Sequence, residues 1–403
     1  MHLTPKLIVE TIFVLGAVSS LGFYFLSGVG IVSFLRSKPR IGHPGHGPLP
    51  PVSFLKPLKG IDPHIWEAFC SHCELDFPDY ELIFGVSDPQ DPAIPFVHRL
   101  QKQYPQRRIE LVICPLDFGT NRKLSTLAQM LPAARHDVLV VNDSDIRVAP
   151  DYLQRVTAPL TDPKVGMVTC LYRGIAGETV GSRMEALGIS TDFVPGVLSA
   201  RIVERGLHFG LGSTLAFRRD DLRATGGFES MLDYLADDYE LGRRIAALGK
   251  RIELSAVVVD TFLPAYSLRQ FFDHQLRWAR SVRGARSGGY LGLVLTYGIP
   301  WALAALVASR GDLRVWWLLA TTAVARLAVG SMSSLLVLGD GLTTRDFFLW
   351  PLRDLIAPVV WVLGLFGNRI VWRGEVFYLD GGRLVRAGAA PAEQPELSHL
   401  SRP

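Results

Sequence analysis

The sequence predicts an α/β protein in which one Rossmann-like domain with a mostly parallel sheet is joined to one N-terminal and about three C-terminal transmembrane helices. Three observations support this prediction. Apolar residues make up 48% of the 403-residue chain, close to the share found in soluble domains, so the chain is not embedded in a membrane throughout. The long apolar runs are confined to the two ends. Between them, short β-rich runs alternate with helical stretches.

The first membrane helix is expected within residues 9–35, where a glutamate at the edge is the only charged residue. About 20 apolar residues suffice to cross the hydrocarbon core. A cleaved signal peptide is the alternative, but the apolar region of such a peptide usually has only about 7–15 residues. We therefore expect residues 1–36 to form an N-terminal transmembrane unit.

Three further apolar blocks occupy residues 290–309, 315–338 and 347–366. They make residues 289–374 the predicted C-terminal transmembrane region. Arg353 and Asp354 interrupt the third block, and charge at membrane depth is costly unless it is paired. A re-entrant or interfacial helix is therefore the alternative for that block.

Basic residues indicate the sidedness of the chain. Arg36, Lys38 and Arg40 directly follow the first apolar run, and the positive-inside rule places that end, with the domain after it, in the cytoplasm. The net charge of +4 is modest and predicts no nucleic-acid partner. Arginines gather in residues 266–288, which we expect to form an amphipathic helix at the membrane interface. The Ala- and Pro-rich tail, residues 387–403, is expected to be disordered.

Residues 50–265 form the predicted α/β domain. The apolar runs VSFLKP, YELIFGV, RIELVIC and DVLVVN alternate with helical stretches, a pattern typical of a parallel sheet covered on both faces. Ligands of such sheets collect at the carboxyl ends of the strands. The segment KPLKGIDP after the first strand lacks the pattern G-x-G-x-x-G, which disfavours a dinucleotide-dependent oxidoreductase.

Two carboxylates follow the run DVLVVN. Asp143 and Asp145 are separated by one residue, and both face one site if the strand geometry persists through Ser144. Carboxylate oxygens suit Mg²⁺ or Mn²⁺, ions that bind through one or two carboxylates plus substrate phosphates. Such an ion would stabilise the charge on a departing diphosphate. A solvated turn is the alternative, because Asp and Asn are common in turns.

Two further acidic pairs lie at ends of predicted elements. Asp88 and Asp91 follow the run YELIFGV, where Asp88 is a candidate for binding the base or ribose of a nucleotide and the flanking prolines favour a plain turn. Asp237 and Asp238 begin a predicted helix, where acidic side chains also stabilise the helix dipole. Asp238 is our candidate for a general base that deprotonates an acceptor hydroxyl.

The segment YSLRQFFDHQLRWARSVRGAR mixes aromatic with basic side chains. The general interpretation is a helix lying on the membrane with its aromatic residues in the headgroup zone. A sharper interpretation assigns Arg277 to a diphosphate and Trp278 to the floor of an acceptor pocket. The two interpretations are compatible.

In their order along the chain, these segments resemble inverting glycosyltransferases of the family 2 type, and more closely the ceramide glucosyltransferase group of family 21. The resemblance runs from about residue 55 to residue 374 and rests on KPLKGIDP, GVSDPQDPA, NDSDIRV, GSTLAFRRDDLRATGGFE, ADDYELG, HQLRWAR and the closing WRG. It implies a GT-A domain that uses a divalent metal ion, a nucleoside diphosphate sugar as donor and a membrane lipid as acceptor.

The resemblance also implies roles for individual residues. It implies binding of the nucleotide sugar by Asp88, Asp143, Arg277 and Trp278, a Mg²⁺ or Mn²⁺ site at Asp143 and Asp145, and a catalytic base at Asp238. One departure concerns the family's Q/R-x-x-R-W motif, because His274 stands at the position that is usually Gln or Arg. Further candidate site residues are Asp91, Asp237, His274, Gln275 and Lys123.

Among bacterial relatives, the chain looks most similar to glycosyltransferases of hopanoid biosynthesis. That similarity implies transfer of N-acetylglucosamine from UDP-N-acetylglucosamine to bacteriohopanetetrol, a hopanoid polyol, at the bacterial inner membrane. A ceramide glucosyltransferase that makes glucosylceramide is the nearest alternative. A processive polysaccharide synthase is disfavoured, because three C-terminal spans supply few helices for a channel. The alternative from another class is a non-catalytic membrane scaffold with a transferase fold. The intact set of Asp143, Asp145, Asp238, Arg277 and Trp278 argues against it.

Overall fold

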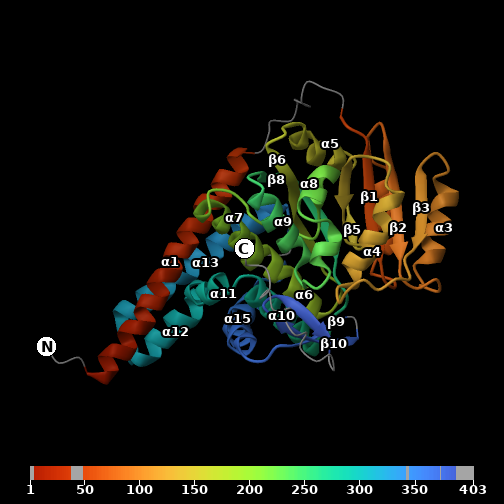
Figure 1. The fold of residues 1–403 in the computed structure, drawn as a ribbon. Coiled ribbons are helices and arrows are strands. Elements are labelled where there is room, and N and C mark those ends of the chain that lie inside the picture. Colours follow the sequence, from red (N-terminus) through yellow and green to blue (C-terminus); the bar gives the residue numbers. More distant parts are fainter. Residues whose placement is uncertain (1–3, 38–48, 342–344, 373, 387–403) are drawn as a thin grey trace, which may run out of the picture.

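A computed structural model describes residues 4–37, 49–341, 345–372 and 374–386. An α/β domain lies on one side of the molecule, and long apolar helices extend from its other side (Figure 1). The helix α1 (Pro5–Ser37) runs from the N-terminal end of the bundle to the domain. Lys38 and Arg40, on which the predicted sidedness depends, and the tail at residues 387–403 lie outside the described residues.

The α/β domain is built on an eight-stranded mixed sheet with the order β3-β2-β1-β4-β7-β6-β8-β5. Its strands are β1 (Val52–Leu58), β2 (Tyr80–Val86), β3 (Arg108–Ile113), β4 (Val138–Val141), β5 (Ile146–Arg147), β6 (Val165–Ile175), β7 (Leu215–Arg218) and β8 (Arg251–Phe262). The strands β1 to β4 pair in parallel, as do β6 and β8, whereas β7 and β5 run against their neighbours. The predicted mostly parallel sheet is confirmed.

Helices cover both faces of this sheet. They are α2 (Ile65–Cys73), α3 (Ile94–Gln103), α4 (Arg122–Met130), α5 (Tyr152–Thr157), α6 (Val180–Gly188), α7 (Val194–Val203), α8 (Arg219–Ala224) and α9 (Asp237–Ala247). The apolar strands bury side chains in both directions, so two cores form. One of them also contains Tyr24, Ile31 and Phe34 of α1. The long apolar helix α1 and the α/β domain therefore share a hydrophobic core.

The contact between α1 and α7 is close because small residues face each other. A Cβ atom on Gly30 would lie 2.7 Å from the carbonyl oxygen of Leu198, and the hydroxyls of Ser27 and Ser199 are 2.9 Å apart. Small residues at such a contact let helix backbones approach. This packing sets the position of the α/β domain along α1.

Four helical stretches in the described residues are long and apolar enough to cross a membrane. They are Pro5–Ser37, Val180–Val203, Leu313–Leu338 and Phe347–Leu365. The second of these was not expected from the sequence, and 61% of its apolar window is buried within the protein. The predicted span at residues 290–309 is instead a pair of helices, Ser287–Thr296 and Gly298–Ala308, bent by 54°. Their lengths allow a broken span or a re-entrant loop.

The helices after the α/β domain are α10 (Leu268–Ala285), α11 (Ser287–Gly292), α12 (Gly298–Ala308), α13 (Leu313–Ser331) and α15 (Trp350–Leu365). In Figure 1, α12 and α13 lie along α1, and α15 lies below α11 and beside α10. The amphipathic helix expected at residues 266–288 is present as α10. Ser267 begins α10 with a capping box. The Ser267 side chain accepts a hydrogen bond from the backbone N–H of Gln270, and the Gln270 side chain accepts one from the backbone N–H of Ser267.

A small antiparallel sheet, unanticipated from the sequence, follows the last helix. It consists of β9 (Arg369–Trp372), β10 (Glu375–Asp380) and β11 (Arg383–Arg386). The backbone N–H of Leu384 donates to the carbonyl of Asp233 at 2.6 Å, and that of Leu235 donates to Gly382 at 3.2 Å. This C-terminal sheet therefore holds the segment that leads into α9.

Candidate active site

A cavity of about 1400 Å³ joins the carboxyl ends of the central strands to the apolar helices. Among the predicted site residues, its lining includes Lys123, Asp143, Asp145, Asp237, Asp238, His274, Gln275, Arg277 and Trp278. Its other walls come from α1, α7, α11, α12 and the C-terminal sheet. Residues predicted to act on a nucleotide sugar thus share one space with membrane-type helices.

Asp143 and Asp145 lie in a turn, since β4 ends at Val141. The assumption that strand geometry persists through Ser144 is therefore wrong. The turn is closed by the backbone N–H of Ile146, which donates to the carbonyl of Asp143 at 3.4 Å. Both side chains still line the cavity. The two carboxylates therefore face one site, as expected, although they lie in a turn and not in a strand.

The two carboxylates of this turn differ in environment. The Asp143 side chain is 43% exposed, whereas Asp145 accepts a hydrogen bond from the hydroxyl of Thr261 at 2.5 Å. Burial, followed by the charge of Asp143, raises the pKa of Asp145 to about 6. A positive charge placed between the two carboxylates would relieve their repulsion.

A buried lysine, Lys56, donates a hydrogen bond to the turn that carries Asp143 and Asp145. Lys56 is fully buried, and its ammonium donates to the backbone carbonyl of Asp143 at 3.0 Å and lies 3.3 Å from Nε2 of His72. Burial lowers the pKa of Lys56 to about 7, against the attraction of Asp145 and Asp143. The sequence points to Lys56 only as part of KPLKGIDP, because nothing local shows which side chain it would meet.

Lys123 of α4 bridges two acidic pairs. Its ammonium lies 2.8 Å from Oδ1 of Asp143 and 3.1 Å from Oδ2 of Asp237. Burial alone would lower the pKa of Lys123, but Asp143 and Asp237 hold it above its usual value. This contact connects the turn after β4 to the start of α9.

Asp238 is held at the first turn of α9 by two backbone donors. The N–H of Gly212 donates to its Oδ2 at 2.7 Å, and the N–H of Tyr239 donates to its Oδ1 at 2.8 Å. Burial, followed by the charge of Asp237, raises the pKa of Asp238 to about 6. The predicted helix start is confirmed, and the carboxylate has the raised pKa that favours proton transfer near neutral pH.

The donor set after β4 fits a divalent ion only in part. Among the described residues, no group of three or more His, Cys, Asp or Glu side chains could hold a metal ion by itself. Asp143 and Asp145 supply two hard oxygen ligands, and Mg²⁺ characteristically takes the remaining ones from water and substrate phosphates. The residues therefore fit an ion that arrives with, or is completed by, a diphosphate.

Asp88 and Asp91 are not among the residues that line the cavity, although the neighbouring Ser87 is. Asp88 is exposed and accepts from the backbone N–H of Gln90 at 2.8 Å, as in an Asx turn. Asp91 is buried, and both of its oxygens accept from the backbone N–H of Gly60 at 3.0–3.1 Å. Nucleotide binding by Asp88 stays a prediction, and Asp91 has a visible structural role.

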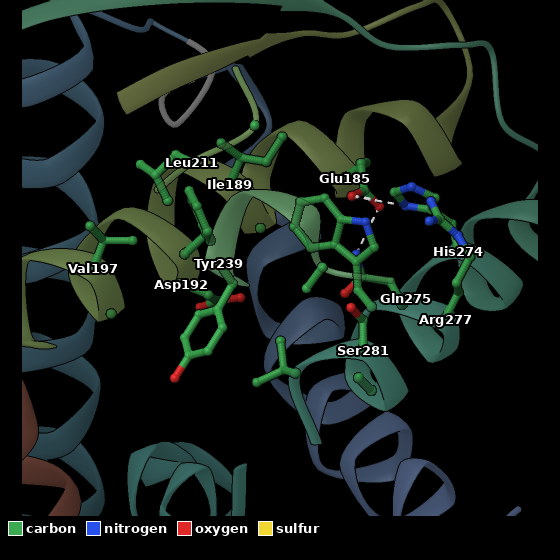
Figure 2. Close-up of a pocket in the computed structure, with 18 of the residues that line it drawn as sticks. Glu185, Ile189, Asp192, Val197, Leu211, Tyr239, His274, Gln275, Arg277 and Ser281 are labelled. Atoms are coloured by element: carbon green, nitrogen blue, oxygen red, sulfur yellow. Dashed lines mark hydrogen bonds and ion pairs between the residues drawn. The ribbon is translucent and has the colours of Figure 1, made fainter. Parts of the chain in front are cut away.

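The motif residues on α10 form one wall of the cavity (Figure 2). The imidazole of His274 lies 3.2 Å from a carboxylate oxygen of Glu185, and Gln275 donates to the other oxygen at 2.8 Å. The His274 ring also stacks on Tyr266 and lies 5.4 Å from the ring of Trp278. His274, whose role the sequence left open, thus joins buried Glu185 to Trp278.

Gly242 presses α9 against the segment that precedes Gly212. A Cβ atom on Gly242 would lie 2.3 Å from the backbone nitrogen of Gly210 and 2.5 Å from the carbonyl carbon of Phe209. Because backbone cannot give way as a side chain can, Gly242→Ala should displace the start of α9. We expect a loss of about 1–3 kcal/mol in the free energy of unfolding and reduced turnover, measured by thermal unfolding and activity in detergent.

Gly196→Ala is the matched control for stability. Gly196 also lies in a helix, and nothing lies within 4 Å of the position where its Cβ atom would be. Alanine is favoured over glycine in helices by about 1 kcal/mol, so this variant should be as stable as the wild type or slightly more so. Equal losses in the two variants would contradict the packing argument.

Comparison with known proteins defines the family. The sequence profile of Glycosyl transferase family 21 matches residues 13–385. The chain belongs to this family. The match includes most of α1, the apolar helices after the α/β domain and most of the C-terminal sheet, as well as the α/β domain itself. Family 21 membership agrees with the resemblance drawn from the motifs.

Individual relatives of this family 21 chain are distant. It is 25% identical over 385 residues to ceramide glucosyltransferase 3 of Caenorhabditis elegans, and the aligned region covers 91% of this chain and 82% of that one. It is 26% identical over 200 residues to β-monoglucosyldiacylglycerol synthase of Synechocystis sp., covering 49% and 40% of the two chains. Among solved structures, it resembles mannosyltransferase PcManGT from Pyrobaculum calidifontis in complex with GDP-Man and Mn²⁺, with a TM-score of 0.54, 22% identity and 89% and 99% coverage. The last similarity shows the GT-A type of fold.

Proposed function

We propose that this chain transfers a sugar from a UDP-sugar to the hydroxyl group of a membrane lipid, with inversion at the sugar carbon. One observation carries the proposal. A single cavity is lined at one end by Asp143, Asp145 and Asp238 and at the other by residues of α1, α7 and α12. A polar donor and an apolar acceptor can therefore meet there. Family 21 membership and the ceramide and diacylglycerol glucosyltransferases among the relatives support the same reaction.

In this proposal Asp238 acts on the acceptor. Its carboxylate takes the proton from the lipid hydroxyl, whose oxygen attacks the anomeric carbon from the face opposite the diphosphate. The bond between that carbon and the diphosphate oxygen breaks in the same step, so the configuration inverts. A direct displacement needs one base, and the hydrogen bonds from Gly212 and Tyr239 hold this carboxylate in place.

The residues opposite Asp238 act on the donor. Asp143 and Asp145 would hold a Mg²⁺ or Mn²⁺ ion, whose positive charge stabilises the leaving diphosphate when it is bound. Arg277 supplies a fixed positive charge on the cavity wall, suited to phosphate oxygens. Lys123 bridges Asp143 and Asp237 and balances part of their negative charge. Asp88 would contact the nucleoside outside the main cavity.

Two lipids are candidate acceptors, ceramide and bacteriohopanetetrol. Relatives that cover most of the chain are ceramide glucosyltransferases, which favours glucose transfer to ceramide. The motif resemblance described above favours transfer of N-acetylglucosamine to bacteriohopanetetrol. In both cases we propose an integral protein of a bacterial inner membrane with its α/β domain in the cytoplasm, as the basic residues after the first helix predict.

The test is a matrix of donors and acceptors with the purified protein in detergent. UDP-glucose and UDP-N-acetylglucosamine are each supplied with ceramide or with bacteriohopanetetrol, with and without Mg²⁺ or Mn²⁺, and products are identified by mass spectrometry. Glycosylation of either lipid supports the function and names the acceptor. Donor turnover to water alone, with no lipid product under any combination, would overturn it.

Trp278→Ala should impair use of the lipid more than use of the donor. The indole lies between His274 and Phe193, at ring distances of 5.4 and 6.1 Å, on the cavity wall that leads towards the membrane helices. We expect the KM for the acceptor to rise by about tenfold, since removing an aromatic ring from a pocket costs on the order of 1.5 kcal/mol. Slow hydrolysis of the UDP-sugar in the absence of acceptor should change little. A larger effect on donor hydrolysis would place Trp278 at the donor instead.

A further inference from the structure

A cluster of four charged side chains lies where the cavity meets the membrane helices, beyond the residues assigned above. It consists of Asp192, Arg326 of α13, and Arg353 and Asp354 of α15, and all four line the cavity. Charged side chains within apolar helices are costly, so they mark functional positions by default. Each one here is paired, which resolves the cost expected for Arg353 and Asp354.

The pairing converges on Asp192. Arg326 donates to Oδ1 of Asp192 at 2.5 Å and to Asp354 at 2.7 Å, and Arg353 donates to Oδ2 of Asp192 at 3.2 Å. The side chains of Arg326, Arg353 and Asp354 are only 6%, 8% and 12% exposed, whereas that of Asp192 is 35% exposed. Asp192 is thus the most exposed member of the cluster within the cavity.

The backbone at Asp192 departs from a regular helix. Residues Ile189–Phe193 form a π-helical turn, η3, between α6 and α7. The side chains of α13 and its continuation hold this turn, since Arg326 donates to the carbonyl of Thr191 at 2.7 Å and Ser333 donates to that of Ser190 at 2.6 Å. Single π-helical turns within α-helices occur frequently at functional sites. This observation is independent of the charges.

The turn also touches the acceptor side of the proposed active site. Phe193, next to Asp192, places its ring 6.1 Å from Trp278 and 5.0 Å from Tyr172. Arg353, the partner of Asp192, donates to Gln275 at 2.8 Å, and Gln275 belongs to the same wall (Figure 2). The carboxylate of Asp192 therefore lies beside the path from Trp278 to the membrane helices.

The cluster presents hydrogen-bond acceptors to the cavity but no surplus charge. Two arginines and two aspartates cancel in charge, so the cluster offers no surplus positive charge to a phosphate group. The oxygens of Asp192 each accept one hydrogen bond from an arginine and retain a free lone pair. A hydroxyl or amide N–H of a lipid can donate there, whereas an ester oxygen cannot.

We infer that Asp192 is a specificity-determining residue that selects neutral lipid acceptors with a hydrogen-bond donor besides the hydroxyl that receives the sugar. This inference rests on the proposed lipid glycosyltransferase function. Ceramide, with an amide N–H and a second hydroxyl, and a hopanoid polyol both meet the condition. Diacylglycerol, with its single hydroxyl, does not.

The experiment compares matched acceptors on the purified full-length protein. The first pair is short-chain ceramide and the same ceramide methylated at the amide nitrogen and the secondary hydroxyl. The second pair is bacteriohopanetetrol and a hopanoid with one hydroxyl. Because hydrogen bonds to charged groups are strong, the wild type should prefer the better donor in the pair that it uses by at least about tenfold in kcat/KM. Asp192→Ala should abolish this preference and leave the KM for the UDP-sugar unchanged.

Asp354→Asn is the control for a merely structural role. It weakens the pairing of Arg326 as Asp192→Ala does but keeps the carboxylate of Asp192, so the acceptor preference should persist even if the protein is less stable. If Asp192→Ala fails to fold, the wild-type comparison and the Asp192→Leu variant, which has a similar size but no acceptor oxygen, decide. Equal kcat/KM for the matched lipids in the wild type, or an unchanged preference in the Asp192 variant, overturns this inference alone. Transfer to no lipid overturns the proposed function as well.

Discussion

Asp238→Asn should lower the turnover number by about 10²–10⁴-fold, the usual contribution of a general base. The amide keeps the shape of the side chain and its hydrogen bond from Gly212, but it cannot accept the acceptor's proton. Binding of the UDP-sugar, measured by calorimetry, should stay close to that of the wild type. Because the carboxylate is the active form and burial raises its pKa to about 6, wild-type turnover should also decline as the pH falls through about 6.

Asp220→Asn provides the matched control for this change. The Asp220 side chain is 89% exposed and lies on α8, so the same loss of charge there should leave turnover unaltered. If Asp238→Asn loses donor binding together with turnover, the residue belongs to the nucleotide site and another base must be sought.

Asp145→Asn should remove most of the transfer activity and its stimulation by Mg²⁺ or Mn²⁺. Stabilisation of the leaving diphosphate by a metal ion contributes several kcal/mol, which corresponds to at least about 10²-fold in rate. The fold should not suffer. Burial raises the pKa of Asp145, so its ionised form disfavours folding near neutral pH, and a neutral amide should give an equal or higher unfolding temperature.

Chelation with EDTA is the companion measurement. The wild type should lose activity in EDTA and regain it with added Mg²⁺ or Mn²⁺, whereas Asp145→Asn should respond weakly to either. Full activity of the wild type in EDTA, together with an active Asp145→Asn variant, would show that the carboxylates after β4 act without a metal ion.

Local patterns sufficed for the sheet and for most of the acidic site. Apolar runs of strand length predicted β1 to β4, and acidic residues at their ends predicted a site at the carboxyl edge of the sheet. Asp143, Asp145 and Asp238 do share one cavity. The strand geometry predicted for Asp143 and Asp145 was wrong, because the chain turns at Ser144.

The partners of these residues could not be predicted in the same way. Lys56 meets Asp143 across 87 positions, and Arg326 meets Asp192 across 134, so no window of sequence contains both members of either pair. Glu185 and Asp192 lie in a segment whose apolar character is typical of a core helix, and its π-helical turn has no sequence signature. The strands of the C-terminal sheet were missed because each is short and begins with a charged residue, unlike the continuous apolar run of β4.

The central claim is that this chain adds a sugar to a membrane lipid through Asp238, and lipid extracts test it most directly. Cells that express the wild-type chain are compared by mass spectrometry with cells that express equal amounts of the Asp238→Asn variant and with cells that lack the chain. The proposed function predicts a lipid carrying one hexose or N-acetylhexosamine in the first extract alone. Identical lipid profiles in all three, with ceramide and hopanoid polyols both present as acceptors, would contradict it.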